Sequence, residues 1–156
     1  MEQTQEVKYA GFWIRILAGI LDIIFLLPPI IIVSYILGID LAQYVSQMYE
    51  IAQNPYVKPQ FDKFDKSVDM VIYFLSISYL TYFVAAKGQA TPGKSILKLY
   101  VGNRDGSKLT SLKSLLRALA SILNAFTVGL GFLPVAFTKE KVSLHDWLCG
   151  TRVFRR

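Results

Sequence analysis

FWIRILAGILDIIFLLPPIIIVSYILGI, residues 12–39, is the stretch that decides the fold of this 156-residue chain. A helix needs roughly 20 apolar residues to cross the hydrocarbon core of a bilayer, so this run is long enough to span a membrane. It nevertheless contains Arg15, Asp22 and the pair Pro28-Pro29. Charged groups inside a membrane helix are costly and need partners elsewhere in the fold. The sequence therefore predicts a membrane helix whose polar residues depend on later segments.

The composition favours a membrane protein over a soluble one. The chain is 53% hydrophobic and 18% charged, whereas soluble domains are about 25% charged. Its net charge of +6 comes from bases that cluster beside the hydrophobic segments, which indicates orientation in a membrane with anionic lipids on the cytoplasmic side rather than binding to nucleic acid. The polar N-terminus lacks a basic region and a cleavage site, so we expect the first helix to remain in the protein.

Arg15 and Asp22 are seven residues apart, so they share a helix face and lie about 10 Å apart along the axis. Because helical side chains lean toward the N-terminus, a direct bridge between them is strained, and we expect a third polar group or water between them. Pro28 and Pro29 leave the carbonyls of Ile24 and Phe25 without helical partners, within a turn of Asp22. Two interpretations stay open, a broken helix that coordinates a cation and a kinked helix packed on its neighbours.

Two further helices follow. Asp40 is placed to cap a short amphipathic helix, LAQYVSQMYEIAQ, which is too polar to span and is expected on the membrane surface, followed by a loop to residue 67. The second spanning helix is predicted at about 68–86. Its hydroxyl-bearing residues either line a polar path or bond within their own helix; they are Tyr73, Ser76, Tyr79 and Tyr82.

The next segment contains GQATPGKS, residues 88–95, which matches the phosphate-binding pattern G-x-x-x-x-G-K-S. That pattern requires a buried strand before it and a helix that opens at its Lys-Ser, and a membrane helix precedes it here, so we expect no nucleotide. The segment ILKLYVGNRDGSKLT, with turn residues Asn103, Asp105 and Gly106, predicts a small β-hairpin in a cytoplasmic loop at 87–111.

The C-terminal third begins with an amphipathic helix capped by Ser111, in which an apolar leucine stripe lies opposite Lys113 and Arg117. Residues 118–138 are uncharged, long enough to cross, but contain Asn124, Gly129, Gly131 and Pro134. Seven bases lie between Lys87 and Arg117 and five after residue 138. The positive-inside rule then favours a stretch that enters and returns, because both termini stay cytoplasmic.

The predicted fold is therefore an all-α membrane protein in a single domain of residues 1–156. It has two long transmembrane helices, at about 12–39 and 68–86, and a surface helix with its loop at 40–67. The cytoplasmic β-hairpin loop follows at 87–111, then an amphipathic helix and a broken third crossing or re-entrant helical hairpin at 112–138. A cytoplasmic tail with the HDW motif, residues 139–156, completes the chain and is expected near the start of the first helix.

Four pieces, in order, resemble the RDD family of bacterial membrane proteins. They are GFWIRILAGILD, ATPGKSILKLYVGNRDG, SLLRAL and SLHDWLCGTRV. The resemblance implies a multi-pass protein of the plasma (inner) membrane whose named charges are Arg15, Asp22 and Asp146. It also implies exchange of monovalent cations for protons, as proposed for some members, in which case the few helices of one copy require a homo-oligomer.

We expect the three charges to form one cluster, a base between two acids, that leaves one carboxylate open to a proton or a cation. The supporting residues are His145, as a candidate proton relay, with Arg117, Pro28, Pro29 and Thr151. The alternative is a structural or assembly protein in which the cluster only locks helix packing. An enzyme is not expected, nor a cofactor or a metal centre, since one histidine and Cys149 supply at most two ligands where catalytic zinc needs three.

Overall fold

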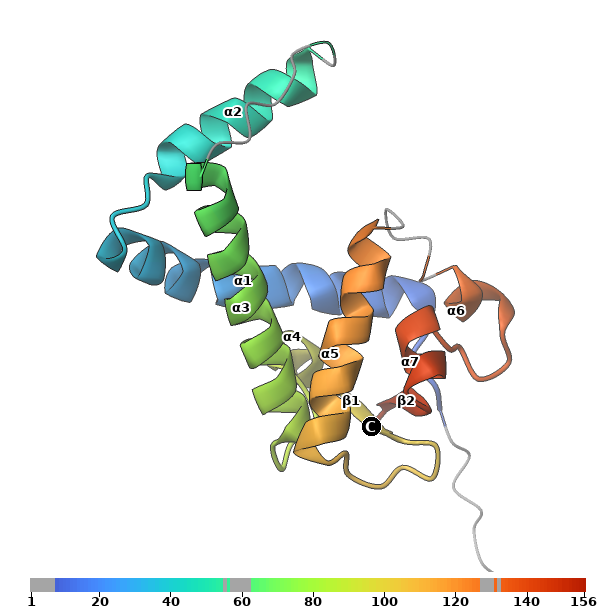
Figure 1. The fold of residues 1–156 in the computed structure, drawn as a ribbon. Helices are drawn as coiled ribbons and strands as arrows, with labels where there is room; N and C mark the ends of the chain where they lie inside the picture. Colours follow the sequence, from blue (N-terminus) through green and yellow to red (C-terminus); the bar gives the residue numbers. More distant parts are fainter. Residues whose placement is uncertain (1–7, 55, 57–62, 127–130, 132) are drawn as a thin grey trace, which may run out of the picture. The chain divides into compact units, whose positions relative to one another are not determined.

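The structure is a computed structural model that describes residues 8–54, 56, 63–126, 131 and 133–156 (Figure 1). Its elements follow one another as α1 (Phe12–Ile36), α2 (Leu41–Gln53), α3 (Lys63–Ala85), α4 (Pro92–Ile96), β1 (Leu99–Asn103), α5 (Ser111–Phe126), α6 (Pro134–Phe137), α7 (Leu144–Leu148) and β2 (Thr151–Arg155). Two compact units share these elements. Unit 1 comprises Met1–Phe25 with Ile77–Arg156, and unit 2 comprises Leu26–Ser76.

Two helices are long and apolar enough to cross a membrane, α1 over Phe12–Ile36 and α3 over Lys66–Ala85. A core helix of a soluble protein buries its apolar face, whereas only 11% of the most hydrophobic window in each of these helices is buried. Trp13, Ile23 and Phe74 are among the large side chains left exposed. So much exposed apolar surface suits lipid as the solvent, so the predicted pair of long apolar helices is confirmed.

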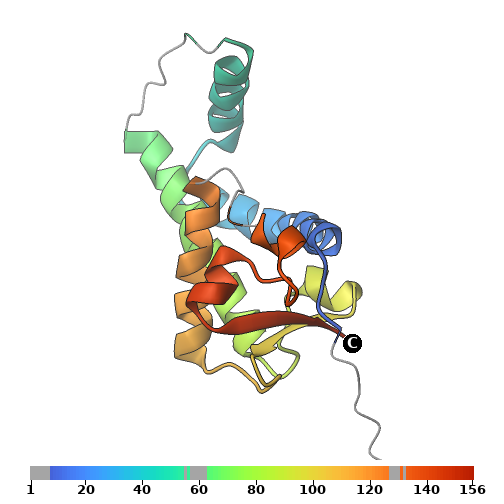
Figure 2. The same cartoon turned by 90° about the vertical axis from the view of Figure 1, so that its right-hand side faces the viewer.

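The predicted β-hairpin is wrong. Its turn forms, since Asn103 N donates to Ser107 O at 2.9 Å and Gly106 N to Asn103 O at 2.9 Å. However, the residues after the turn form no strand, and β1 pairs instead with the C-terminal strand β2 in an antiparallel register that sets Val101 opposite Val153. Figure 2 shows the two strands side by side at the end of the chain. The tail offers a five-residue partner, which the short polar stretch after the turn does not.

The N-terminal segment extends this sheet on the other side of β2. Ala10 N donates to Val153 O at 2.9 Å, Arg155 N donates to Lys8 O at 2.8 Å, and Tyr9 forms a β-bridge with Phe154. Lys8–Ala10, β1 and β2 therefore lie in one sheet-like layer, although they come from the two ends and the middle of the chain.

Unit 1 is held together by a small apolar core between this layer and the helices. It contains Ala10, Ala18, Val84, Leu99, Val101, Leu109 and Val153, with Ile14 and Leu97 packed against it. The core joins α1 and the end of α3 to the sheet, and so fixes the position of the polar groups that α1 carries.

The predicted third crossing is divided between separate helices, α5 and α6. The expected fold-back at about Asn124–Gly131 lies mostly outside the described residues, although α5 continues through Asn124 to Phe126. Within the described part of the chain, no third helix reaches membrane-spanning length. The chain after α6 returns to α5, because Asp146 of α7 pairs with Arg117 of α5.

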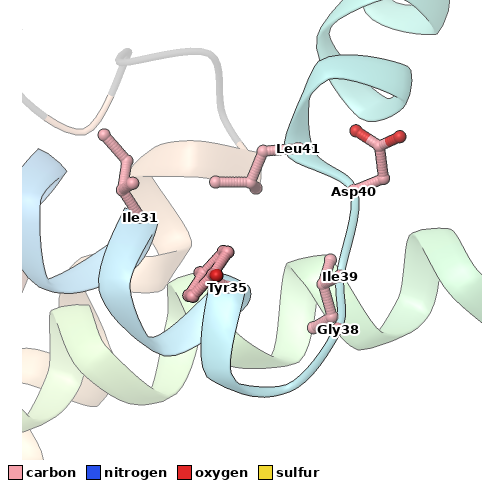
Figure 3. A pocket seen from close by; sticks show the side chains of 6 residues that line it. All are labelled: Ile31, Tyr35, Gly38, Ile39, Asp40 and Leu41. Atoms are coloured by element: carbon pink, nitrogen blue, oxygen red, sulfur yellow. The ribbon is translucent and has the colours of Figure 1, made fainter.

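Unit 2 contains the second half of α1, the helix α2 and the first half of α3. The predicted cap of α2 is confirmed, since the Asp40 carboxylate accepts hydrogen bonds from Ala42 N and Gln43 N. A shallow cavity of about 440 Å³ opens where α1 turns into α2 (Figure 3), lined by Ile31, Tyr35, Gly38, Ile39, Asp40 and Leu41. Its one charged group, Asp40, is already used in capping, so the cavity is essentially apolar.

Candidate functional site: two buried carboxylates

Asp146, on α7, is completely buried and has two guanidinium partners. Its Oδ2 lies 2.7 Å from Nη1 of Arg15 on α1, and its Oδ1 lies 2.8 Å from Nη2 of Arg117 on α5. The hydroxyls of Ser143 and Thr151 also donate to it, at 2.7 and 3.1 Å. This set, the Asp146 cluster, ties together three helices and the start of β2.

The charges of the Asp146 cluster keep its carboxylate ionised. Burial by itself raises the pKa of Asp146, but the guanidiniums of Arg117 and Arg15 outweigh it and hold this pKa well below the usual range. Burial, together with the charge of Arg117, lowers the pKa of His145 to about 3. Nη2 of Arg117 lies 3.3 Å from Nε2 of His145. Because a guanidinium only donates, this nitrogen is the acceptor and His145 is neutral.

Arg15 is fixed by the backbone as well as by Asp146. Its Nε donates to Ala10 O at 3.0 Å and its Nη2 to Lys141 O at 2.5 Å. Ala10 is also the residue that joins β2, so the guanidinium links the sheet, the α6–α7 connection and α7. A buried guanidinium satisfied on three sides is typical of an architectural contact.

Asp22, on α1, lies in a different set of partners, here called the Asp22 site. Its Oδ2 accepts from the Thr91 hydroxyl at 2.6 Å, and its Oδ1 from the Tyr79 hydroxyl at 2.9 Å and from Gly93 N at 2.8 Å. The ammonium of Lys94 is 3.5 Å from Oδ2 and 3.3 Å from the Thr91 hydroxyl. One cation thus balances the Asp22 carboxylate.

Gly93 is at this position because α4 comes into close contact with α1. A Cβ on Gly93 would lie 2.5 Å from Ala18 O and 2.7 Å from Oδ1 of Asp22, which is closer than any real contact. Thr91 precedes the helix in extended conformation and Pro92 begins it, a favourable first residue because it has no amide hydrogen to satisfy. The absence of a side chain therefore lets the backbone of α4 meet the carboxylate directly.

The phosphate-binding pattern at 88–95 has an explanation in this contact. A helix opens just before its lysine and the predicted strand follows it. The backbone amide of Gly93 and the ammonium of Lys94, which would face a phosphate in a nucleotide site, are directed at Asp22 instead. Amides at a helix start and a lysine suit any anion. Here the anion is a carboxylate of the chain itself.

Lys94 is almost enclosed, with 14% of its side chain exposed. Burial lowers the pKa of Lys94, while the nearby Asp22 carboxylate acts in the opposite direction. The Asp22 carboxylate is thus balanced by one buried ammonium, whereas the Asp146 carboxylate is balanced by two guanidiniums.

The prediction that Arg15, Asp22 and Asp146 form one cluster is therefore wrong, but the predicted contact between Arg15 and Asp146 is confirmed. Arg15 meets Asp146 as expected, and Arg117, His145 and Thr151 are all in that cluster. Asp22, however, pairs with Lys94, so the arrangement is two bases on one acid and one base on the other. Pro28 and Pro29 belong to unit 2, inside a continuous α1.

Sequence reasoning missed the partners of Asp22, namely Thr91, Gly93 and Lys94. The signal was present in ATPGK, whose Thr-Pro-Gly favours a helix start, although no helix was predicted there. Tyr79 was considered, and of the four hydroxyl-bearing residues it is the one bonded to Asp22; Tyr73 and Tyr82 are exposed.

Among the described residues, no group of three or more His, Cys, Asp or Glu is arranged to hold a metal ion.

Comparison with known proteins gives a consistent result. A model of the RDD family matches residues 9–150. The uncharacterised protein YxaI of Bacillus subtilis (strain 168) is 34% identical over 147 residues, which cover 94% of this chain and 97% of YxaI. Another uncharacterised protein of that strain, YckC, is 28% identical over 152 residues, which cover 94% of this chain and 84% of YckC. No solved structure matches the chain.

Proposed function

Because the chain belongs to the RDD family, we propose that it is a multi-pass protein of the bacterial plasma membrane that exchanges monovalent cations for protons at Asp22. One observation carries the proposal. A carboxylate in the middle of a membrane-length helix has a single ammonium and two hydroxyls as side-chain partners. Ionisable groups within membrane helices are typical of ion pathways and proton relays.

The chemistry of the exchange follows from these partners. The Asp22 carboxylate with the hydroxyls of Thr91 and Tyr79 offers the oxygen ligands that hard monovalent cations prefer. The Lys94 ammonium now balances the carboxylate, and a proton or a monovalent cation takes over that role when the ammonium withdraws. Since a proton and a cation compete for the same oxygens, binding of one releases the other, and the charge of the site is conserved.

The sheet-like layer supports a topology with both termini in the cytoplasm. Backbone partners in a sheet lie on one side of the membrane, and this layer joins Lys8–Ala10, the segment after α3, and the C-terminal strand. Two crossings, α1 and α3, return the chain to the side from which it started. The seven bases between Lys87 and Arg117 assign that side to the cytoplasm. With two crossing helices per copy, an enclosed ion path needs a homo-oligomer.

The alternative function is a structural or assembly role, and the Asp146 cluster favours it. Every side chain there has charged or hydroxyl partners, and together they fix α1, α5 and α7. A lock of this kind needs no ion movement. The two functions are compatible if the Asp146 cluster holds the frame in which the Asp22 site works.

The experiment is ion-driven proton flux in proteoliposomes, followed with an internal pH dye after Na⁺, K⁺ or Li⁺ is added outside. We expect flux from the native protein and background flux from Asp22→Asn. The matched control is Asp69→Asn, because Asp69 lies on the other membrane-length helix and bonds to the Tyr44 hydroxyl. Flux from Asp22→Asn equal to that of the native protein contradicts the exchange. Background flux from the native protein, with every variant folded, favours the structural alternative.

A further inference from the structure

The amphipathic helix α5 is packed with its polar side inward. Arg117, Ser114 and Ala118 are buried, at 5%, 2% and 2% exposed. The leucines of the opposite face, Leu112, Leu116 and Leu119, are 68%, 52% and 43% exposed. A soluble domain has the reverse arrangement, since its leucines face the core.

The short helix α7 repeats this arrangement. His145 and Asp146 face inward, while Trp147 and Leu148 are 69% and 52% exposed. α7 packs on α5 through the Arg117–Asp146 pair, and each helix exposes its large apolar side chains on the side away from that pair. We call Leu112, Leu116, Leu119, Trp147 and Leu148 the leucine face. An apolar surface of this kind marks a contact with lipid or with another protein.

The exposed charges of unit 1 favour an anionic partner for this face. Among the described residues of unit 1, the exposed charged side chains are those of one acid, Asp105, and nine bases: Lys8, Lys87, Lys98, Arg104, Lys108, Lys139, Lys141, Arg155 and Arg156. Lys139 and Lys141 immediately precede α7. An apolar face on a unit with many exposed bases complements the acyl chains and phosphates of an anionic leaflet.

The two tryptophans indicate how deep in the bilayer this part of the protein lies. Trp13 is 80% exposed at the start of α1, and Trp147 is exposed on α7. They neighbour the two partners of one ion pair, since Arg15 is bonded to Asp146. Tryptophan is enriched at the boundary between acyl chains and headgroups. A 16-residue helix is about 24 Å long, shorter than the roughly 30 Å hydrocarbon core.

We propose that the leucine face of α5 and α7 is immersed in one leaflet of an anionic phospholipid bilayer, at headgroup depth, without crossing it. The exposed bases of unit 1 bind the lipid phosphates, and the buried Arg117 and Asp146 stay on the protein side. The inference does not depend on ion exchange at Asp22.

Tryptophan quenching by brominated lipids tests the proposal in the full chain. Trp13→Phe leaves Trp147 as the only tryptophan, and Leu116→Trp added to Trp13→Phe/Trp147→Phe places one on α5. Each variant is reconstituted in phosphatidylglycerol vesicles that carry bromine either near the headgroup end or near the methyl end of the acyl chain. We expect both tryptophans to be quenched several-fold more by the shallow bromine. Ser107→Trp in the same double variant is the aqueous control, because Ser107 lies exposed in the turn after β1.

The outcomes separate the alternatives. Strongest quenching by the deep bromine means that this region crosses the bilayer, and it overturns the proposal. Quenching by aqueous iodide but not by lipid means an exposed face, and protection from both means a protein contact such as a second copy; either result also overturns it.

The role of the bases is tested separately with spin-labelled lipids. We expect the native protein to select phosphatidylglycerol over phosphatidylcholine, and Lys139→Gln/Lys141→Gln to reduce that selectivity several-fold; unchanged selectivity overturns the role of the bases.

Discussion

Asp146 and Asp22 are both buried carboxylates in unit 1, yet their surroundings differ in kind. Asp146 has two guanidiniums and two hydroxyls, and its cluster carries an excess positive charge. Asp22 has one ammonium at 3.5 Å, two hydroxyls and one backbone amide. Guanidiniums are permanently charged and bind in a fixed planar geometry, whereas an ammonium on a flexible stem can withdraw. The proposed exchange rests on this difference, since the Asp146 cluster is expected to hold the fold and the Asp22 site to change partner.

The first prediction concerns the Asp146 cluster and has the largest expected effect. Asp146→Asn leaves two buried guanidiniums without their counter-charge, and removal of one partner of a buried ion pair costs about 3–5 kcal/mol. We expect a correspondingly lower free energy of unfolding, measured by thermal or denaturant unfolding in detergent. Asp105→Asn is the control, because Asp105 is exposed and bonds within its own turn. Equal stability of the two variants contradicts the role of Asp146 as a lock.

The second prediction concerns the close contact at the Asp22 site. Gly93→Ala places a Cβ 2.5 Å from Ala18 O, so α4 has to move away from α1. Overpacking of this kind costs about 1–3 kcal/mol. Gly88→Ala is the matched control in the same loop, since a Cβ there meets nothing within 4 Å. We expect a lower melting temperature for the Gly93 variant alone, and identical melting of the two variants would show that α4 is not held against Asp22.

How much of the fold and of the two carboxylate sites could be predicted depends on how far apart in the sequence the interacting residues lie. Runs of apolar residues revealed α1 and α3, and a local cap revealed α2, because both signals lie within one element. The Arg15–Asp146 pair was expected from the family pattern rather than from spacing. The Asp22 site was missed because a close backbone approach at Gly93 depends on how two helices meet. The pairing of β1 with β2 was missed for a similar reason, since a local turn pointed to a hairpin and the actual strand is about fifty residues away.

The third prediction concerns the pH dependence of stability, which we expect to arise at His145 in the Asp146 cluster. The pKa of His145 falls from an ordinary 6.5 to about 3 in the folded protein, so below pH 6.5 the unfolded chain binds a proton that the folded chain does not. Stability is therefore complete above pH 6.5 and is lost as the pH falls, by about 1.4 kcal/mol per pH unit. The acids with shifted pKa values outside the spanning helices, Asp105, Glu140 and Asp146, all have lowered values, so they stay ionised between pH 6.5 and 5.5. Burial also lowers the pKa of Lys94, so a variant without His145 is needed to assign the slope.

His145→Gln tests the assignment, because the chain contains one histidine. We expect the native protein to lose melting temperature between pH 6.5 and 5.5, while the variant, although less stable throughout, shows no such slope. A slope that survives the substitution belongs to another group, and Lys94, whose pKa is lowered by burial, is then the next residue to examine. If the slope disappears, the pH sensitivity of folding belongs to the Asp146 cluster, and the pH dependence of ion flux at the Asp22 site is then measured in His145→Gln, whose stability does not change over this pH range.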